Sequence, residues 1–263
     1  MSCLAEQAKI LYAEAEENNL AFKVQNERWK RWYSCSLCEQ EYHGVVRCAL
    51  GWACWKTYVG RPEADWARGA AMTELGLGLS AVNKHEDAVS VGEAELAILR
   101  RLGDTPDNIL SVQSNLACTY SVLGREEEAL DMRQKVYSGR LKLGGEEDEM
   151  TLNAACNYAT SFYGLDRFEE ATSLFRKTIP VARRVLGEAH EITLGMRQNY
   201  AQGLLENSAA TLDDLREAVT TLEETERTRR RVFGGAHPLT TGIDVPLRKA
   251  RAKLRAREAR ESK

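Results

Sequence analysis

Three short sequence marks recur in the same order about every 42 residues, and this internal repeat constrains the fold more than any other feature. The first mark is a large apolar residue before a small one, the second is a carboxylate directly before an alanine, and the third is a large apolar residue before glycine. The alanines of the second mark are Ala88, Ala129, Ala171 and Ala218, at intervals of 41, 42 and 47 residues. A period of this length indicates one supersecondary unit copied along the chain.

The residue types of the marks predict the structure of each unit. Glycine after the last apolar residue of a helix is a stop signal, because only glycine enters the left-handed region at low cost. Each unit is therefore predicted to hold a helix, a turn, a second helix and a glycine stop. Since so short a helix pair buries little alone, successive units must stack on one another. The first marks are Leu75-Gly76, Leu116-Ala117, Tyr158-Ala159 and Tyr200-Ala201, and the third are Leu102-Gly103, Leu143-Gly144, Leu186-Gly187 and Phe233-Gly234.

The marks also set the expected boundaries of an all-α chain. Residues 1–62 are expected to form an N-terminal helical cap. Residues 238–263 are expected to form a C-terminal capping helix with a basic tail, since eight basic and two acidic residues follow from Arg248 onward. Between them, residues 63–237 are expected to hold four helix pairs, the last with five added residues around Glu206–Leu212. The expected pairs are 63–103, 107–144, 149–187 and 191–234.

The segment Asn115–Tyr120, followed by Leu123–Ala129, resembles a tetratricopeptide repeat. Val185–Leu194 and Phe233–Thr240 are similar to the kinesin light chain variety of that repeat. The first unit departs from this variety, because Asp104-Thr105-Pro106-Asp107 stands where a His-Pro element is usual. The resemblance implies a right-handed α-α superhelix, the tetratricopeptide (TPR) solenoid, whose concave groove binds a peptide or another protein.

One polar position repeats within the apolar pattern, as Asn115, Asn157 and Asn199 at intervals of 42 residues. Asparagine is a poor residue for a helix interior, so its threefold presence needs a reason. In the family that the chain resembles, this position lines the concave groove. The resemblance therefore implies that the three amides bind the backbone of an extended peptide, since an amide both donates and accepts hydrogen bonds. The alternative is that these asparagines only join neighbouring helices; the first unit has Glu74 at this position.

Cys35 and Cys38 form a C-x2-C pair, the spacing with which two thiolates bind one tetrahedral zinc ion. Adding His43 and Cys48 gives C-x2-C-x4-H-x4-C, the spacing of a zinc knuckle, and this would indicate a binder of single-stranded nucleic acid. However, Val45–Tyr58 has the pattern of an apolar helix, so Cys48 fits a helix core equally well. We expect no cofactor, with zinc as the alternative.

A second completion of the cysteine pair rests on a family resemblance. Three parts of the chain together resemble the back half of a RING-CH zinc finger: Cys3 with its following residues, a helical stretch containing Trp29 and Trp32, and Cys35–Tyr42. Cys3 would match the cysteine that follows the family's histidine, and Cys35 with Cys38 would match its last pair. These positions belong to two different zinc ions in that finger, and the front half has no counterpart, so the resemblance implies a remnant. An accessory or truncated relative of a RING-CH ubiquitin ligase is therefore the alternative function.

Composition and charge exclude several classes of protein. The chain is 43% apolar and 29% charged, as folded domains are. The net charge of −3 does not indicate a nucleic-acid surface, and no apolar run approaches the roughly 20 residues of a membrane helix. Seven cysteines are an odd number, which argues against a disulfide framework and for the reducing cytoplasm.

No motif of enzymatic chemistry is present: the sequence has no P-loop, no H-E-x-x-H and no G-x-S-x-G. His85, His190 and His237 fall at turns between the expected helices, where histidines cap helices more often than they catalyse. We therefore expect a non-enzymatic scaffold that binds a protein or peptide, without a nucleic-acid or membrane partner. The sequence leaves the partner's identity and the oligomeric state open.

Overall fold

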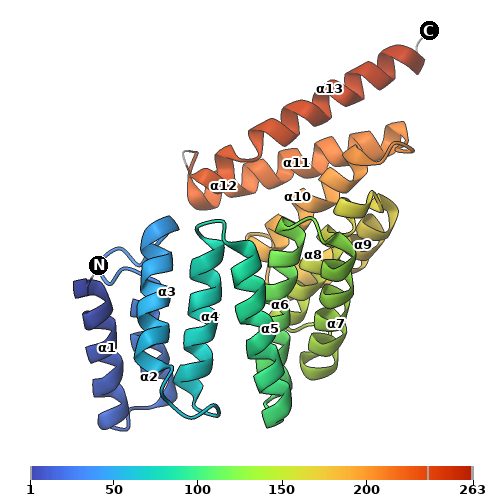
Figure 1. Cartoon of the computed structure of the whole chain (residues 1–263). Helices are drawn as coiled ribbons and strands as arrows, with labels where there is room; N and C mark the ends of the chain where they lie inside the picture. Colours follow the sequence, from blue (N-terminus) through green and yellow to red (C-terminus); the bar gives the residue numbers. More distant parts are fainter. Residues whose placement is uncertain (1, 236, 262–263) are drawn as a thin grey trace. The chain divides into compact units, whose positions relative to one another are not determined.

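The structure is a computed structural model that describes residues 2–235 and 237–261 (Figure 1). These residues form helices and one isolated antiparallel bridge between Ser34 and Glu41, and they contain no strand. The predicted all-α class is therefore confirmed. Contacts divide the chain into two compact units, residues 1–125 (unit 1) and residues 126–263 (unit 2). Ala236 of the Phe233–Thr240 segment and the last two residues of the predicted basic tail lie outside the described residues.

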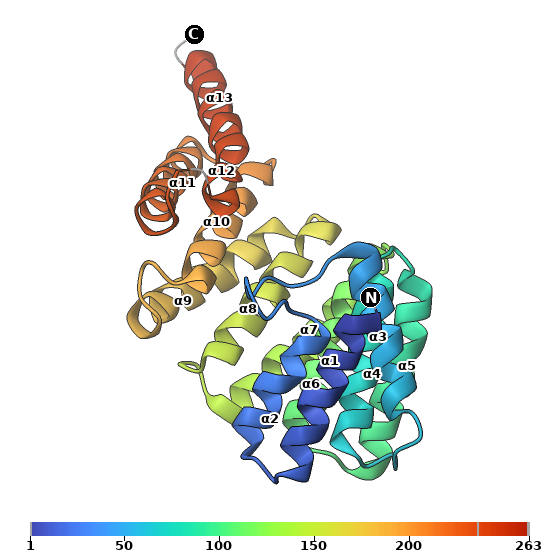
Figure 2. The same ribbon diagram turned by 90° about the vertical axis from the view of Figure 1, so that its left-hand side faces the viewer.

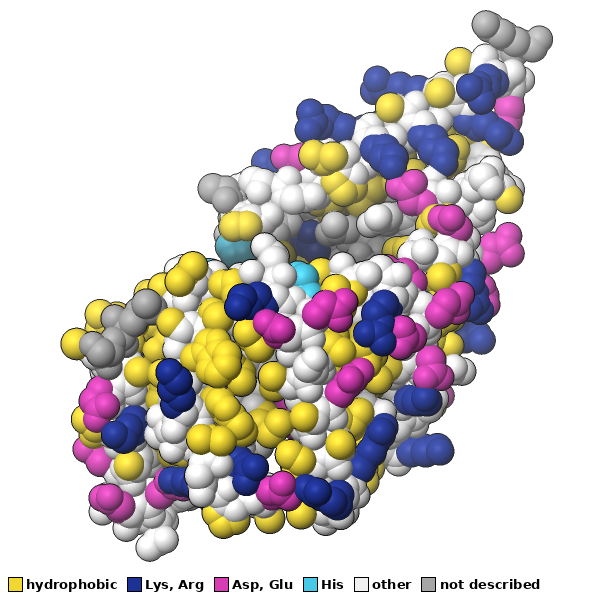
Figure 3. All heavy atoms as spheres, viewed as in Figure 1, with side chains coloured by type: hydrophobic (Ala, Val, Ile, Leu, Met, Phe, Trp, Pro, Cys, Tyr) yellow, Lys and Arg dark blue, Asp and Glu magenta, His cyan; other side chains and the backbone are white. Residues whose placement is uncertain are grey.

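Unit 1 contains the N-terminal cap and the first three helices of the repeat region. From α3 to α6, each helix packs against the next one along the chain (Figure 2). Hydrophobic side chains gather on one face of this unit, over α3 and α4 (Figure 3). The elements are α1 (Ser2–Glu17), α2 (Phe22–Trp29), the 3-10 helix η1 (Lys30–Trp32), α3 (Gly44–Tyr58), α4 (Trp66–Ser80), α5 (His85–Leu102) and α6 (Pro106–Val122).

Unit 2 contains the remaining helices. Its core centres on Phe175, which is fully buried, and α13 covers α11 with a stripe that includes Leu247 and Ala250. Each of the four predicted helix pairs holds two helices, but the boundary between the units falls inside the pair at 107–144, so the domain boundaries stay a prediction. The elements are α7 (Glu126–Gly144), α8 (Glu149–Ser161), the 3-10 helix η2 (Tyr163–Leu165), α9 (Phe168–Val185), α10 (Glu191–Glu206), α11 (Leu212–Phe233), α12 (Pro238–Thr241) and α13 (Asp244–Glu261).

Side chains cap several helices at their first turns. His190 and His237 act as predicted: the Nδ1 atom of His190 accepts from the backbone N–H of Ile192 at 3.3 Å, and that of His237 accepts from Leu239 at 3.2 Å. Both bonds satisfy a backbone donor that the helix itself leaves without a partner. The prediction is wrong for His85, which is the first residue of α5, a helix without a side-chain cap.

Three of the four glycines that were predicted to stop a helix have a left-handed backbone. Gly103, Gly187 and Gly234 have φ of +66°, +93° and +86°. The fourth stop is shifted by one residue, because α7 continues through Gly144 and the left-handed residue is Gly145, with φ of +79°.

The helix backbones of α3 and α4 approach each other closely in unit 1. A Cβ atom on Gly51 would lie 2.5 Å from the carbonyl oxygen of Glu74, and one on Gly78 would lie 3.0 Å from that of Arg47. These two glycines therefore let the cap dock directly onto the first repeat helix, backbone against backbone.

Gly51→Ala is expected to lower the free energy of unfolding by about 1–3 kcal/mol, because the new methyl group would overlap backbone atoms that have no rotamer to change. Gly69→Ala in α4 is the matched control: its Cβ would meet nothing within 4 Å, so the better helix former should stabilise by about 0.5–1 kcal/mol. Urea unfolding followed by tryptophan fluorescence measures both. Equal effects of the same sign would contradict the close packing.

Candidate functional site

Two adjoining hollows lie in unit 1 between α4 and α6, with volumes of about 180 and 30 Å3. Their walls are formed by some of the residues of α4, α5 and α6, together with residues 63–65 before α4 and Asp104 before α6, and we call the two hollows together the α4–α6 groove. Gly76 of α4 and Gly92 of α5 line the second hollow, and Gly92 lets α5 lie close to Leu116 of α6, since a Cβ there would lie 2.8 Å from Cδ2 of Leu116. The groove is a surface that the stacking of helix pairs produces without any separate motif.

Glu95 of α5 lines both hollows and is the one carboxylate that they share among the described residues. Its side chain is buried, with 5% of the residue exposed, and Oε1 accepts a hydrogen bond from Oγ1 of Thr73 at 2.6 Å. Among the described residues, no Lys, Arg or His nitrogen lies within 4.0 Å of its oxygens. Burial without a cation raises the pKa of Glu95 to about 7, and the Thr73 hydrogen bond offsets only part of that effect.

This pKa makes the stability of unit 1 depend on pH. The folded state binds the Glu95 proton more tightly, because the pKa of Glu95 is about 7 there and near 4.5 in the unfolded state. Protonation of Glu95 therefore stabilises the fold fully below about pH 4.5, and this stabilisation is lost as the pH rises through about 7. One pH unit of difference corresponds to about 1.4 kcal/mol, so the loss is on the order of 3 kcal/mol.

We expect Glu95→Gln to remove this loss, because the amide still accepts from Thr73 but does not ionise. Urea unfolding at pH 5 and pH 8, followed by tryptophan fluorescence, should show a much smaller decrease in the variant than in the wild type. Glu86→Gln, at an exposed position of the same helix, is the control and should follow the wild type. Identical decreases in all three proteins would disprove the assignment.

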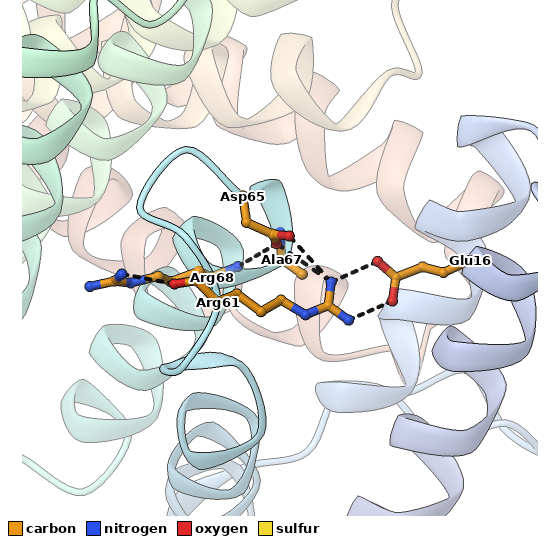
Figure 4. A network of polar contacts seen from close by, with 5 residues as sticks. All are labelled: Glu16, Arg61, Asp65, Ala67 and Arg68. Carbon is orange, nitrogen blue, oxygen red and sulfur yellow. Dashed lines mark hydrogen bonds and ion pairs between the residues drawn. The ribbon is translucent and has the colours of Figure 1, made fainter.

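A polar network fixes the end of the groove nearest the N-terminal cap (Figure 4). Asp65 caps α4 by accepting from the backbone N–H of Ala67 at 2.9 Å, and Arg61 donates two hydrogen bonds of 2.7 Å to Glu16 of α1. Arg68 donates to the carbonyl oxygen of Arg61 at 2.9 Å. The network therefore ties α1 to the first turn of α4 and sets the position of the groove's first residues.

The three predicted asparagines have different surroundings. Asn115 is exposed on α6 and lines the second hollow of the groove. Asn157 of α8 and Asn199 of α10 belong to unit 2 and are half-buried. The Asn199 side chain donates to Sγ of Cys156 at 3.7 Å, which is the helix-joining role that the alternative interpretation assigned. The peptide-binding role of all three stays a prediction.

Cys35 and Cys38 lie on a short hairpin closed by hydrogen bonds from Cys35 N–H to the Gln40 carbonyl at 2.9 Å and from Tyr42 N–H to the Tyr33 carbonyl at 2.8 Å. The backbone N–H groups of Cys38 and Leu37 point at Cys35 Sγ and lower the pKa of its thiol. The hairpin thus presents two neighbouring thiols at the surface of unit 1.

The other proposed metal ligands are placed on separate elements. Cys3 lies on α1, His43 precedes α3, and Cys48 packs within α3 against a cluster that contains Leu75 and Leu79. Within residues 2–235 and 237–261, no three His, Cys, Asp or Glu side chains are gathered closely enough to hold a metal ion. Because structural zinc requires four ligands, the two hairpin thiols alone do not fit a zinc site, and the zinc ligands stay a prediction without structural support.

No described helix combines the length and apolar character needed to cross a lipid bilayer.

Comparison with known proteins adds evidence on the fold. Residues 108–184 match the model of the tetratricopeptide repeat family. None of the curated proteins matches the sequence. Among solved structures, BtubC (BKLC) from P. vanneervenii is similar, with 19% identity, a TM-score of 0.66, and coverage of 81% of this chain and 86% of that one.

Two structures of a putative kinesin light chain with nearly identical TPR-like repeats, from Podosopora anserina, are also similar. One of them, a form with a single substitution, has 19% identity, a TM-score of 0.59 and coverage of 88% and 97%, and the other has 19% identity, a TM-score of 0.57 and coverage of 88% and 96%. At this identity the likeness concerns the fold alone. The chain therefore has the fold of a TPR solenoid, as the resemblance of its repeats implied, and its segment 108–184 matches the tetratricopeptide repeat family directly.

Proposed function

We propose that this chain is a non-enzymatic scaffold that binds an extended segment of another protein in the α4–α6 groove. The observation that carries the proposal is the groove itself, a hollow of about 180 Å3 continued by a smaller one, with both apolar and hydrogen-bonding side chains on its walls. Pockets that combine apolar walls with a few placed polar groups are the usual form of a binding site. The odd cysteine count and the seven free cysteines support the cytoplasm as the place of this function.

Asn115 supplies the polar group that suits a peptide backbone. Its exposed amide stands beside the apolar side chain of Leu116 and beside Thr119, all three on the wall formed by α6. A peptide bond offers one donor and one acceptor, and a single amide side chain pairs with both. We propose the same role in unit 2 for Asn157 and a smaller one for Asn199, whose amide already donates to Cys156.

Neither alternative function gains support from a specific feature of the described residues. Among the residues that the structure describes, no further metal ligands gather around the hairpin with Cys35 and Cys38, as the RING-CH relative and the zinc-knuckle nucleic-acid binder would both require. We therefore propose neither of them.

Selection of peptides from a displayed library, followed by calorimetric titration, tests the proposal. Asn115→Trp should abolish binding of the selected peptides by filling the second hollow. Asn115→Ala should weaken it about two- to tenfold, since the loss of one hydrogen bond costs about 0.5–1.5 kcal/mol. Cys118→Trp is the control, because Cys118 is exposed on the same helix and lines neither hollow. If Asn115→Trp binds the peptides as the wild type does, the groove is not the binding site.

A further inference from the structure

We propose that the larger hollow of the α4–α6 groove takes the cationic side chain of a lysine or arginine from the bound segment. This inference rests on the proposed function and gives its site a ligand chemistry. It follows from the charge, the shape and the aromatic wall of the hollow.

The charge of the lining is strongly one-sided. Four carboxylates and one guanidinium line the hollow: Glu63, Asp65, Glu95, Asp104 and Arg68. Clefts lined by one sign of charge attract ligands of the opposite sign, and low-dielectric walls strengthen that attraction. The hollow is therefore suited to a cation.

Glu95 is the carboxylate within this group that has no basic or backbone partner. It is buried, it accepts only the Thr73 hydroxyl, and among the described residues no basic nitrogen approaches it within 4.0 Å. Burying a carboxylate without a cation costs free energy that an entering cation recovers. The other three are already engaged: Glu63 with Arg101, Asp65 with the backbone N–H of Ala67, and Asp104 with the side-chain amide of Asn108.

The guanidinium group of Arg68 does not pair with Glu95 in the way that we propose for the cation of the ligand. Its Nη1 atom donates to the carbonyl oxygen of Arg61 at 2.9 Å, within the network at the end of the groove. No ion pair joins Arg68 to Glu95. The buried carboxylate thus remains open to a cation that enters from outside.

The shape and the walls fit a long, straight side chain. One water molecule needs about 10–15 Å3, so a hollow of about 180 Å3 has room for a chain of several atoms. Met72, Ile98 and Val112 supply apolar contacts for the methylene groups that lysine and arginine carry before their charge.

Trp66 adds an aromatic wall at the same place. It lines the hollow, 38% of the residue is exposed, and it is held by Tyr12 and Trp29, whose ring centroids lie 6.0 and 4.9 Å away. A tryptophan ring attracts an ammonium or guanidinium group through its negative face. An aromatic wall and a buried carboxylate in one hollow are the two groups that recognise an organic cation.

Titration of the 263-residue chain with n-pentylammonium and with n-pentanoate, followed by the NMR signals of Thr73, Glu95 and Val112, tests the cation assignment. At pH 8 we expect saturable shifts with pentylammonium and none with pentanoate. Glu95→Gln should weaken pentylammonium binding about tenfold or more, since a charged hydrogen bond is lost. Glu86→Gln should bind as the wild type does, and circular dichroism verifies that both variants fold. Equal binding of the two probes, or binding unaffected by Glu95→Gln, would overturn the proposal.

The selected peptides separate this inference from the proposed function. Replacing their lysines or arginines by norleucine should weaken groove binding about tenfold, because the charged hydrogen bond to Glu95 is lost. Peptides that depend on Asn115 but keep their affinity after this replacement overturn the cation assignment and leave the function standing. If pentylammonium binds in the hollow but every selected peptide binds Asn115→Trp as it binds the wild type, the proposed function is overturned and the cation assignment stands.

Discussion

Glu74→Ala is expected to lower the free energy of unfolding by about 3–5 kcal/mol, because it leaves a buried guanidinium without its partner. Glu74 of α4 and Arg47 of α3 are each only 6% exposed, and Oε2 of Glu74 lies 2.5 Å from Nη1 of Arg47. Arginine keeps its proton in proteins. The variant must therefore either bury a full charge or pull α3 away from α4.

Removing the other partner of the pair, by Arg47→Met, should lower the free energy of unfolding clearly less. Burial already raises the pKa of Glu74 despite the neighbouring guanidinium, so the carboxyl group can take up a proton when Arg47 is gone. Arg47→Met should then lower the free energy of unfolding more as the pH rises. A carboxyl group whose pKa is higher in the folded state, as for Glu74 here, stabilises the fold at low pH, and that stabilisation is lost as the pH rises.

Tryptophan fluorescence in urea is the appropriate measurement for this pair, because all five tryptophans lie in residues 1–125. The two variants and the wild type should be compared at pH 5 and pH 8. Lys56→Met, an exposed position on the cap helix α3, is the control and should change little. Equal costs for Glu74→Ala and Arg47→Met at both pH values would show that the pair does not behave as a buried charge pair.

The sequence predicted the repeat well because its evidence is periodic. Small and bulky residues that recur at fixed intervals report which positions are buried, and the structure follows them, as in the fully buried Ala129, Ala171 and Ala218. The shifted stop at Gly144 marks a limit of such evidence. Two glycines stand together there, and only the structure shows that a Cβ on Gly144 would lie 2.7 Å from Cβ of Asp148, the residue that caps α8.

The candidate site was predicted only in part. Asn115 was found because a polar residue recurs at one position of the repeat, whereas Glu95 occurs in one unit and belongs to no motif. A signal was present, since Glu95 lies seven residues after Ala88 and next to Leu96 on the buried stripe of α5. Whether such a carboxylate meets a cation, a hydroxyl group or a cavity depends on the side chains of α4 and α6, which spacing along α5 does not report.

Phe175→Ala is the second substitution with a large expected effect, about 3–5 kcal/mol, because it removes the largest fully buried side chain of unit 2. Phe175 lies on α9 in a cluster with Leu152 of α8 and Tyr200 of α10, so its loss leaves a cavity among three helices. Close packing around the ring prevents full collapse of that cavity.

Hydrogen exchange read by mass spectrometry locates this effect. We expect peptides from α8, α9 and α10 to exchange faster in Phe175→Ala, since their opening free energy falls by the same few kcal/mol. Met150→Ala is the matched control, because Met150 lies on α8 with 48% of the residue exposed and truncation there leaves no cavity. Unchanged exchange in α8 and α10 would mean that Phe175 does not join the helix pairs, which would contradict the stacking that the repeat implies.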